Sequence, residues 1–166
     1  MALRTSASQV NDVVARLRSR EVAMKIEEIF RKKGHDVLTI TESKSVLAAA
    51  EVLVEHNIGG LVVMEGEHAT GIVTERDILR VTARRPGELD SIQVGEVMTR
   101  DLITAKPEDQ LLQMMDVMAE NKIRHLPILE GDRLAGIISI GDLVNACRVV
   151  AEEENSQLRQ YIAGAG

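Results

Sequence analysis

The chain contains an internal repeat with an offset of 65 positions, and this feature constrains its fold more than any other. From Asp36 to Leu79 the two copies align without a gap. Asp36 matches Asp101 at this offset, and Asp77 matches Asp142. Each copy of such a repeat is one supersecondary unit that buries its apolar face against its neighbour. The sequence therefore predicts two equivalent blocks related by a pseudo-twofold axis, with a natural ligand site in the cleft on that axis.

Each copy predicts the same order of elements: strand, helix, strand, strand, helix. The first helix of each copy carries apolar residues at helical spacing, and Ser43 or Ser45 could cap the one in the first copy. Short apolar runs separated by a glycine-containing turn, Glu65–His68 and Glu130–Arg133, predict a hairpin in each copy. The expected strands are residues 37–40, 61–64, 71–74, 102–105, 126–129 and 134–139.

This order predicts an α/β (α+β) fold of two βαββα repeats with added N- and C-terminal helices. The flanking helices carry apolar stripes at 8–18, at 26–34, where Gly34 stops the helix, and at 143–162. Met24 could be an alternative start, since the residues before it lie outside the repeat. The expected segments are an N-terminal helical extension 1–34, the first repeat 35–84, a linker 85–100 with a short helical piece at 94–98, the second repeat 101–148 and a C-terminal helix 149–166.

Composition excludes several classes of function. Phe30 and Tyr161 are the only aromatic residues, so a single-stranded nucleic-acid site built on aromatic stacking is not expected. No apolar run reaches the length of a membrane span, and the one cysteine, Cys147, excludes an internal disulfide. We therefore expect a cytoplasmic protein without membrane contact. No spacing of histidine, cysteine or carboxylate residues indicates a metal site or a catalytic group, so we expect no enzyme.

The net charge of −6 is unevenly spread, because residues 1–33 hold eight basic and four acidic side chains. A basic N-terminal helix could contact nucleic acid or an acidic partner, or it could be a solvated helix face. The solvated face is the simpler interpretation, so nucleic acid is not the partner that we expect.

A hydroxyl residue stands three positions before an aspartate at the end of each hairpin: Thr74 before Asp77, and Ser139 before Asp142. Where a strand runs into a helix, the hydroxyl and the first free N–H groups face outward, and the helix dipole favours phosphate. The aspartate could accept two hydrogen bonds from a ribose diol, or it could simply stabilise the helix N-terminus. Because both copies carry the pattern, we favour ribose binding.

The segments that carry these residues resemble the signature of a tandem pair of CBS domains, a Bateman module. The segments are Gly71–Asp77, Gly136–Asp142, Asn57–Val63 and Lys122–Ile128. The resemblance covers about residues 35–148. It implies clefts between the two repeats that bind an adenine nucleotide, with AMP or NAD favoured over ADP, ATP and S-adenosylmethionine derivatives, and it implies no catalytic cofactor.

The same resemblance implies that each cleft is composite. One cleft would use Ser139, Gly141 and Asp142 with Thr39, Ile40, Gly60, Leu61 and Val62. The other would use Thr74, Arg76 and Asp77 with Thr104, Ala105, Lys106, Leu126 and Pro127. Arg124 and His125 occupy positions where basic residues of the family reach phosphate, although Arg124 could instead be a solvent-facing dimer contact. Because Arg124-His125 align with Gly59-Gly60, the two clefts should differ.

The resemblance therefore implies a stand-alone regulatory module, a nucleotide sensor whose ligand state alters its contact with an unidentified regulated protein. The alternatives are a ligand-free interaction scaffold and a nucleic-acid-linked regulator that uses the basic N-terminal helix. We also expect a homodimer, because five apolar helix residues cannot all face the interior of so small a unit. These residues are Val46, Leu53, Leu111, Met115 and Met118.

Overall fold

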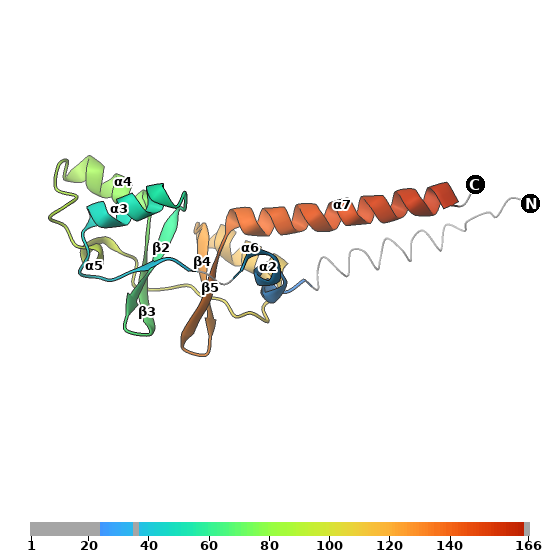
Figure 1. Ribbon diagram of the computed structural model, residues 1–166, viewed down its shortest axis with the longest axis horizontal. Coiled ribbons are helices and arrows are strands. Elements are labelled where there is room, and N and C mark those ends of the chain that lie inside the picture. The colour runs from blue at the N-terminus through green and yellow to red at the C-terminus, as the bar shows by residue number, and fades with distance from the viewer. Residues whose placement is uncertain (1–23, 35–36, 165–166) are drawn as a thin grey trace, which may run out of the picture. The chain divides into compact units, whose positions relative to one another are not determined.

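The computed structural model describes residues 24–34 and 37–164, and its helices and strands follow the predicted order except for the first strand of the second repeat (Figure 1). In chain order the elements are α2 (Ile26–Lys33), β1 (Thr39–Ile40), α3 (Val46–Glu55), β2 (Gly60–Glu65), β3 (His68–Thr74), α4 (Glu75–Arg84), α5 (Val94–Val97), α6 (Leu111–Glu120), β4 (His125–Glu130), β5 (Arg133–Ser139) and α7 (Ile140–Gly164). The expected helical piece in the linker is α5. The expected N-terminal helix at 8–18 lies outside the described residues.

These elements form two compact units that do not follow the order of the sequence. The helical unit consists of α2, α6 and α7, and the sheet unit contains the strands with α3, α4 and α5. Helix α2, which precedes the first repeat, therefore packs with helices of the second repeat, and α5, which precedes the second repeat, lies in the unit of the first. In the helical unit the amide of Leu111 donates to the carbonyl of Met24 over 2.9 Å, and in the sheet unit the amide of Val46 donates to the carbonyl of Ile92 over 2.9 Å. Val46 and Leu111 are equivalent positions of the repeat, so the two bonds are equivalent as well.

The sheet unit contains a three-stranded sheet in the order β1-β2-β3 and a separate two-stranded hairpin, β4-β5. Strand β1 is parallel to β2, and β2 is antiparallel to β3. Helices α3 and α4 lie side by side over β2 and β3 (Figure 1). Between the helices and the sheet, a cluster of buried aliphatic side chains forms the core, as expected for a chain with almost no aromatic residues. It consists of Ile40, Ala49, Leu53, Leu61, Val63, Val73, Val94 and Met98.

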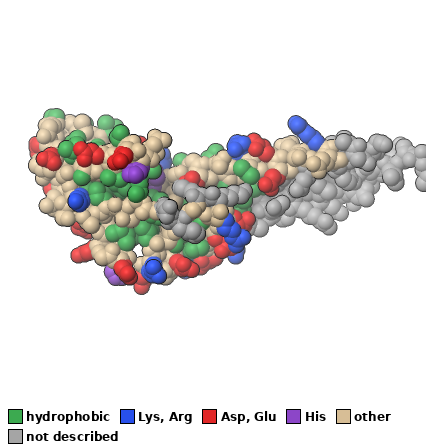
Figure 2. All heavy atoms as spheres, in the orientation of Figure 1, with side chains coloured by type: hydrophobic (Ala, Val, Ile, Leu, Met, Phe, Trp, Pro, Cys, Tyr) green, Lys and Arg blue, Asp and Glu red, His purple; other side chains and the backbone are tan. Residues whose placement is uncertain are grey.

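Local signals in the sequence placed the turns and caps correctly. Gly66 and Gly131 have φ angles of +61° and +63° in the two hairpin turns, a region that favours glycine. Ser45 caps α3 by accepting a hydrogen bond from the amide of Ala48 over 3.1 Å. Gly34, with φ +90°, follows the end of α2. Exposed charged side chains gather along the edge where the hairpin turns lie (Figure 2).

The first strand of the second repeat does not form as expected, and a proline explains why. In the first repeat Thr39 pairs with Val62, and Ile40 pairs with Val63. In the second repeat, the pair equivalent to Ile40 and Val63 remains as an isolated parallel bridge between Ala105 and Ile128. The residue equivalent to Val62 is Pro127, which has no backbone N–H to donate. The strand pairing therefore stops after one bridge. The first repeat also keeps only residues 39–40 of the expected strand 37–40.

We expected a homodimer because five apolar helix residues could not all be covered within one chain, and this premise is wrong. Val46, Leu53, Leu111 and Met118 are all buried within the chain, and only Met115 is half-buried. The exposed large apolar side chains on helices are different ones, namely Leu47, Val54, Leu79 and Val144. A charge placed at Met118 would therefore disrupt the core of the helical unit rather than test an interface.

In the helical unit, α2 and α6 pack against α7 (Figure 1). Cys147 of α7 is half-buried, with its Sγ 3.7 Å from Sδ of Met115 on α6, which fits a small packing residue. The expected lengthening of the last helix is confirmed, because α7 runs from Ile140 to Gly164. The side chains of Leu158, Tyr161 and Ile162, which we expected on its apolar stripe, lie outside the described part of the chain.

Candidate functional site

The junction between β3 and α4 is held by the side chain of Asp77. Its Oδ2 accepts hydrogen bonds from the amide and the hydroxyl of Thr74, over 3.0 and 2.7 Å. Its Oδ1 accepts one from Nη1 of Arg80 over 3.1 Å. Thr74 is the N-cap residue of α4, and Asp77 is 7% exposed. The threonine and the aspartate therefore form a capping box that fixes the start of the helix.

The second repeat builds the same junction between β5 and α7. Oδ2 of Asp142 accepts hydrogen bonds from the amide and the hydroxyl of Ser139, over 2.7 and 2.8 Å. The amide of Asp142 donates back to the hydroxyl of Ser139 over 3.2 Å. The two hydroxyl–aspartate motifs therefore have the same local geometry, although one belongs to the sheet unit and the other to the helical unit.

The first residue of each closing helix is anchored in the same way. The amide of Glu75 donates to the carbonyl of Gly59 over 3.1 Å, and the amide of Ile140 donates to the carbonyl of Arg124 over 2.9 Å. These bonds tie each helix N-terminus to the residue that precedes the central strand of its repeat. The positive end of the helix dipole is thus held beside the backbone of Gly59 in the first repeat and of Arg124 in the second.

The capping role of the aspartates limits what else they can bind. A carboxylate offers about four acceptor positions, and three protein donors already occupy those of Asp77. One acceptor position therefore remains on Asp77 for a ligand hydroxyl. Asp142 accepts two hydrogen bonds from Ser139 and is half-buried, so its carboxylate is the more accessible of the two.

The imidazole of His125 lies against Gly59 and Gly60 within the sheet unit. A Cβ atom added to Gly59 would stand 2.8 Å from Cε1 and Nε2 of the ring, and one added to Gly60 would stand 3.3 Å from its Cγ and Nδ1. The hypothetical Cβ of Gly60 would also lie 3.5 Å from Cγ2 of Thr74. His125 therefore lies beside the capping threonine of α4. The sequence alone showed that these glycines align with Arg124 and His125, but not that the ring takes the space which the glycines leave.

The segment around Ala105 completes this part of the sheet unit. The amide of Ala105 donates to the carbonyl of Pro127 over 3.1 Å, and the amide of Leu129 donates to the carbonyl of Ala105 over 2.8 Å. The side chains of Ala105, Leu126 and Pro127 are buried, whereas Thr104 and Lys106 on either side are exposed. Of the residues expected in one cleft, the structure thus places Ala105 directly beside Pro127.

The expected residues of β1 and β2 are in sheet pairing. Thr39 and Ile40 pair with Val62 and Val63, and Gly60 is the register partner of Thr74. Leu61 and Val62 have fully buried side chains, so only their backbone could meet a ligand. Arg76, Arg124 and Gly141 are exposed at the helix starts and at the residue before β4.

A salt bridge within the sheet unit, between Arg100 and Glu42, was not expected from the sequence. Nη1 and Nη2 of Arg100 donate to Oε1 and Oε2 of Glu42 over 3.0 and 3.1 Å, and Nη2 also donates to the carbonyl of Gly95 over 3.0 Å. The hydrogen bonds from Arg100 hold the pKa of the Glu42 carboxyl below its ordinary value. These two residues are 58 positions apart, and no local pattern pairs them.

Residues 24–34 and 37–164 contain no group of three or more histidine, cysteine or acidic residues that could hold a metal ion. Over the same residues, none of the helices is both long enough and apolar enough to cross a membrane.

Comparisons with known proteins agree on one family. The CBS domain family matches the chain at residues 26–84 and again at 94–149. CBS domain-containing protein CBSX3, mitochondrial, from Arabidopsis thaliana is 36% identical over 148 residues, which cover 84% of this chain and 72% of that protein. The two matched ranges begin earlier than the repeats at 35–84 and 101–148 that we expected, and those boundaries stay a prediction.

Solved structures share the fold. The crystal structure of the CBS-domain containing protein ATU1752 from Agrobacterium tumefaciens has a TM-score of 0.72 at 35% identity, covering 74% of this chain and 98% of that chain. The CBS domain pair of protein MJ0100, crystallised with 5'-methylthioadenosine and S-adenosyl-L-methionine, has a TM-score of 0.63 at 24% identity, covering 75% and 95%. These matches confirm the expected fold of two CBS repeats with mixed helices and small sheets.

Proposed function

This chain belongs to the CBS domain family and contains a CBS pair, and from that premise we propose that it is a regulatory module which binds an adenosine-containing ligand. The observation that carries the proposal is the pair of equivalent capping boxes, Thr74 with Asp77 and Ser139 with Asp142. Each fixes a helix N-terminus next to a carboxylate that retains acceptor capacity. A structure with the same fold was solved with two adenosine derivatives.

The polar part of the ligand would meet the helix start of α4. A phosphate there would gain from the helix dipole and from basic side chains nearby. Arg76, Lys106 and His125 would supply charge-assisted donors. The hydroxyl of Thr74 donates to Asp77 and would border the ligand without donating to it. Asp77 would use its remaining acceptor position for one ribose hydroxyl.

The base would rest on aliphatic surface and backbone. Only two aromatic residues exist in the whole chain, so base stacking on a ring is not the means of recognition. The backbone around Ala105, Leu126 and Pro127 would offer carbonyl and amide groups to the adenine edge. In the second repeat we propose the same ribose role for Asp142, with Ser139 and the exposed Arg124 and Gly141 near the phosphate.

Binding would shift a conformational equilibrium rather than drive a reaction. We propose AMP or NAD as the ligand, no catalytic step, and a regulated protein that reads the ligand state. A homodimer remains part of the proposal, now on the basis of the exposed apolar residues Leu47, Val54 and Leu79.

A second candidate function has one observation in its favour. Because Thr74 and Arg80 already engage most of the Asp77 carboxylate, the sheet unit could serve as an interaction scaffold without a ligand. The scaffold would show no nucleotide-dependent stabilisation. The proposed nucleic-acid alternative rests on the basic N-terminal segment, most of which lies outside the described residues.

The deciding experiment is mass spectrometry of nucleotides released from gently purified protein, followed by thermal unfolding with AMP, NAD, S-adenosyl-L-methionine and GMP. At one hundred times its dissociation constant a ligand adds about 2.7 kcal/mol to the free energy of unfolding. For a chain of this size, that corresponds to a rise in melting temperature of several degrees. We expect this rise with an adenine compound and a smaller one with GMP.

Arg76→Gln should reduce the rise, whereas Arg133→Gln, an equal charge change in β5 at its hairpin end, should leave it unchanged. If no adenine compound at millimolar concentration stabilises the protein, the scaffold is the correct interpretation.

A further inference from the structure

Each repeat carries a cavity beside its closing helix, away from the hydroxyl residue of the capping box. In the sheet unit a cavity of about 340 Å³ lies between α4 and α5, and its walls include Asp77, Arg80, Arg84, Arg85, Ile92 and Glu96. In the helical unit a cavity of about 220 Å³ lies between α2 and α7, and its walls include Met24, Glu28, Asp142, Asn145 and Val149. Thr74 and Arg76 of the proposed nucleotide cleft line neither cavity, whereas the proposed ribose acceptors Asp77 and Asp142 line one cavity each.

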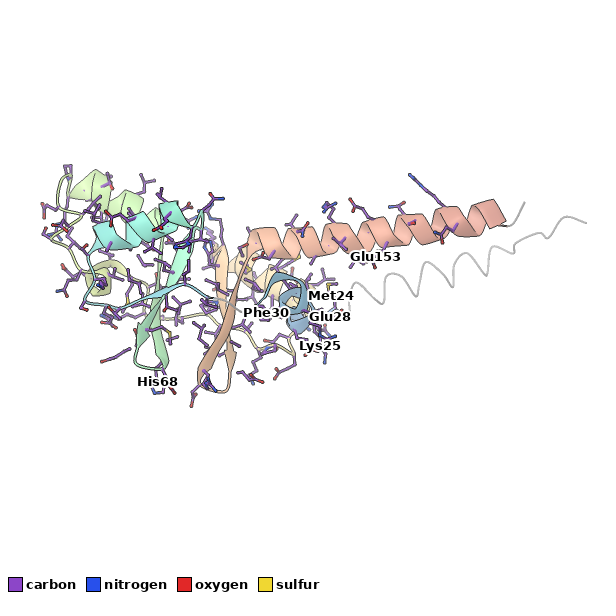
Figure 3. The ribbon with its side chains drawn as sticks, in the orientation of Figure 1. Met24, Lys25, Glu28, Phe30, His68 and Glu153 are labelled. Carbon is purple, nitrogen blue, oxygen red and sulfur yellow. The ribbon has the colours of Figure 1, made fainter. Side chains whose placement is uncertain are left out.

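The two cavities are the same feature built twice. The repeat offset carries Asp77, Arg80 and Arg84 onto Asp142, Asn145 and Val149. On the opposite wall, Glu96 accepts a hydrogen bond from the amide of Gln93 over 3.0 Å. Glu28 accepts the equivalent bond from the amide of Lys25 over 3.1 Å, and Figure 3 shows Met24, Lys25 and Glu28 together at the start of α2.

The cavities differ in charge. Three arginines and two carboxylates line the α4–α5 cavity, which leaves one positive charge. The α2–α7 cavity has two carboxylates and no basic residue on its walls, among the residues that the structure describes. Both repeats form this cavity, but only the first lines it with arginines. The fold itself therefore does not require the arginines.

The arginines retain donors for a ligand. Arg85 pairs with Glu88 over 2.7 Å and lies 3.8 Å from Glu96, and Arg80 uses Nη1 for Asp77. Arg84 is exposed, and it forms no ion pair with any described residue. A guanidinium carries five N–H donors in a planar fork, which fits the oxygens of a phosphate group. The buried side chains of Val81 and Ile92 line the same cavity and reduce the screening of these charges on one side.

We propose that the α4–α5 cavity is a binding site for a small phosphate-type anion, next to the proposed nucleotide cleft, with which it shares Asp77. Arg84 would supply the uncompensated charge, and Arg80 and Arg85 would supply further N–H donors. An anion there would bridge α4 to the linker helix α5 and so stabilise the end of the first repeat. The site goes beyond the proposed nucleotide binding and does not depend on it.

The test is a titration of the full chain with inorganic phosphate, followed by two-dimensional amide NMR spectra. We expect the amides of Val81, Ile92 and Val97 to shift with a dissociation constant in the millimolar range, because the cavity is open and its net charge is small. Arg84→Gln should weaken the affinity about fivefold, as expected for loss of one charge-assisted contact at a solvent-exposed site. Arg133→Gln, an equal charge change in β5, should leave it unchanged.

A second pair of variants tests the direction of the effect. Glu96→Gln should tighten phosphate binding several-fold, because it removes a negative charge from the wall while the Gln side chain still caps α5. Glu28→Gln makes the same change in the equivalent cavity without arginines and should have no effect.

The proposal is overturned if phosphate shifts none of these amides, or if Arg84→Gln and Glu96→Gln both bind phosphate as the wild type does. Displacement of phosphate by AMP with an unchanged Arg84→Gln affinity would assign it to the nucleotide cleft instead. Failure of nucleotide binding alone leaves this result unaffected, since the phosphate titration contains no nucleotide.

Discussion

The ring of His125 fills the space that the missing side chain of Gly59 leaves, and it also borders Gly60, its own equivalent position in the repeat. A Cβ atom on Gly59 would stand 2.8 Å from both Cε1 and Nε2 of the ring, and 3.3 Å from Oε2 of Glu75. Such a distance is too short for ordinary contact. The small residues at Gly59 and Gly60 are therefore a packing requirement beside His125 in the sheet unit. The same divergence of the repeats is the basis on which we expect the two proposed clefts to differ.

Gly59→Ala should destabilise the protein by about 1–3 kcal/mol, because the added methyl group overpacks against His125. The double variant Gly59→Ala/His125→Ala should recover most of that loss, since the ring is the obstacle. Urea unfolding measures both. Gly141→Ala is the control, because the nearest atom to its added Cβ is Oγ of Ser139 at 3.5 Å, an ordinary contact. Equal costs for Gly59→Ala with and without the histidine would contradict the packing argument.

The pair of Glu42 and Arg100 should make stability depend on pH. The hydrogen bonds from Arg100 lower the pKa of Glu42 in the folded state from 4.5, so the carboxylate stabilises the fold above that pH. This contribution is lost as the pH falls through the lowered pKa. Arg100→Gln should therefore be less stable than the wild type at about pH 7, and the difference should shrink towards about pH 3.

Urea midpoints at both pH values measure this difference. Lys44→Gln removes a charge from the neighbouring exposed loop and serves as the control. A difference between the wild type and Arg100→Gln that stays constant over the whole range would show that Glu42 does not titrate with the pair.

Asp77→Ala should cost more stability than Asp142→Ala. Removing Asp77 takes away three hydrogen bonds at a buried position and leaves Arg80 without its partner, which we expect to cost about 2–3 kcal/mol. Asp142 is half-buried, and its loss should cost about 1–2 kcal/mol, as for a helix cap. Thermal unfolding by circular dichroism compares the two. The opposite order would mean that the bonds to Asp77 contribute little.

Pro127→Val should restore a donor that the second repeat lacks. With an N–H at this position the segment at Thr104 can pair as Thr39 does, so the amide of residue 127 should be protected from hydrogen exchange. The reverse change, Val62→Pro, removes an N–H from the central strand of the sheet and should cost about 3 kcal/mol or more. Rapid exchange at position 127 of the valine variant would show that other residues keep the strands apart.

The proposed homodimer should depend on the exposed apolar face of α3 and α4. Val54 is 81% exposed and Leu79 is 67% exposed, so an aspartate at either position is tolerated in the monomer. Val54→Asp and Leu79→Asp should convert a dimer to a monomer in light scattering. Leu38→Asp, on an exposed apolar residue outside the helices, is the control. A wild-type mass of 18.2 kDa at micromolar concentration would rule the dimer out.

The sequence by itself determined the repeat, the order of elements and the local caps. These features depend on residues a few positions apart: glycine at the hairpin turns, Ser45 before α3, and Thr74 or Ser139 three residues before an aspartate. The same short-range pattern placed the candidate ribose acceptors correctly at the helix starts. It could not reveal that the acceptor groups of Asp77 are largely taken by Thr74 and Arg80, because donors and acceptors are satisfied only once the helix forms.

Only the tertiary structure decided which segments share a core. The segment before each repeat packs with the other repeat, so Met24 meets Leu111 and Ile92 meets Val46. This packing also buries four of the five apolar residues that we expected to need a partner chain to cover them. The physical reason is that periodicity shows which face of a helix is apolar but not what covers it, since the covering surface comes from residues distant in the chain.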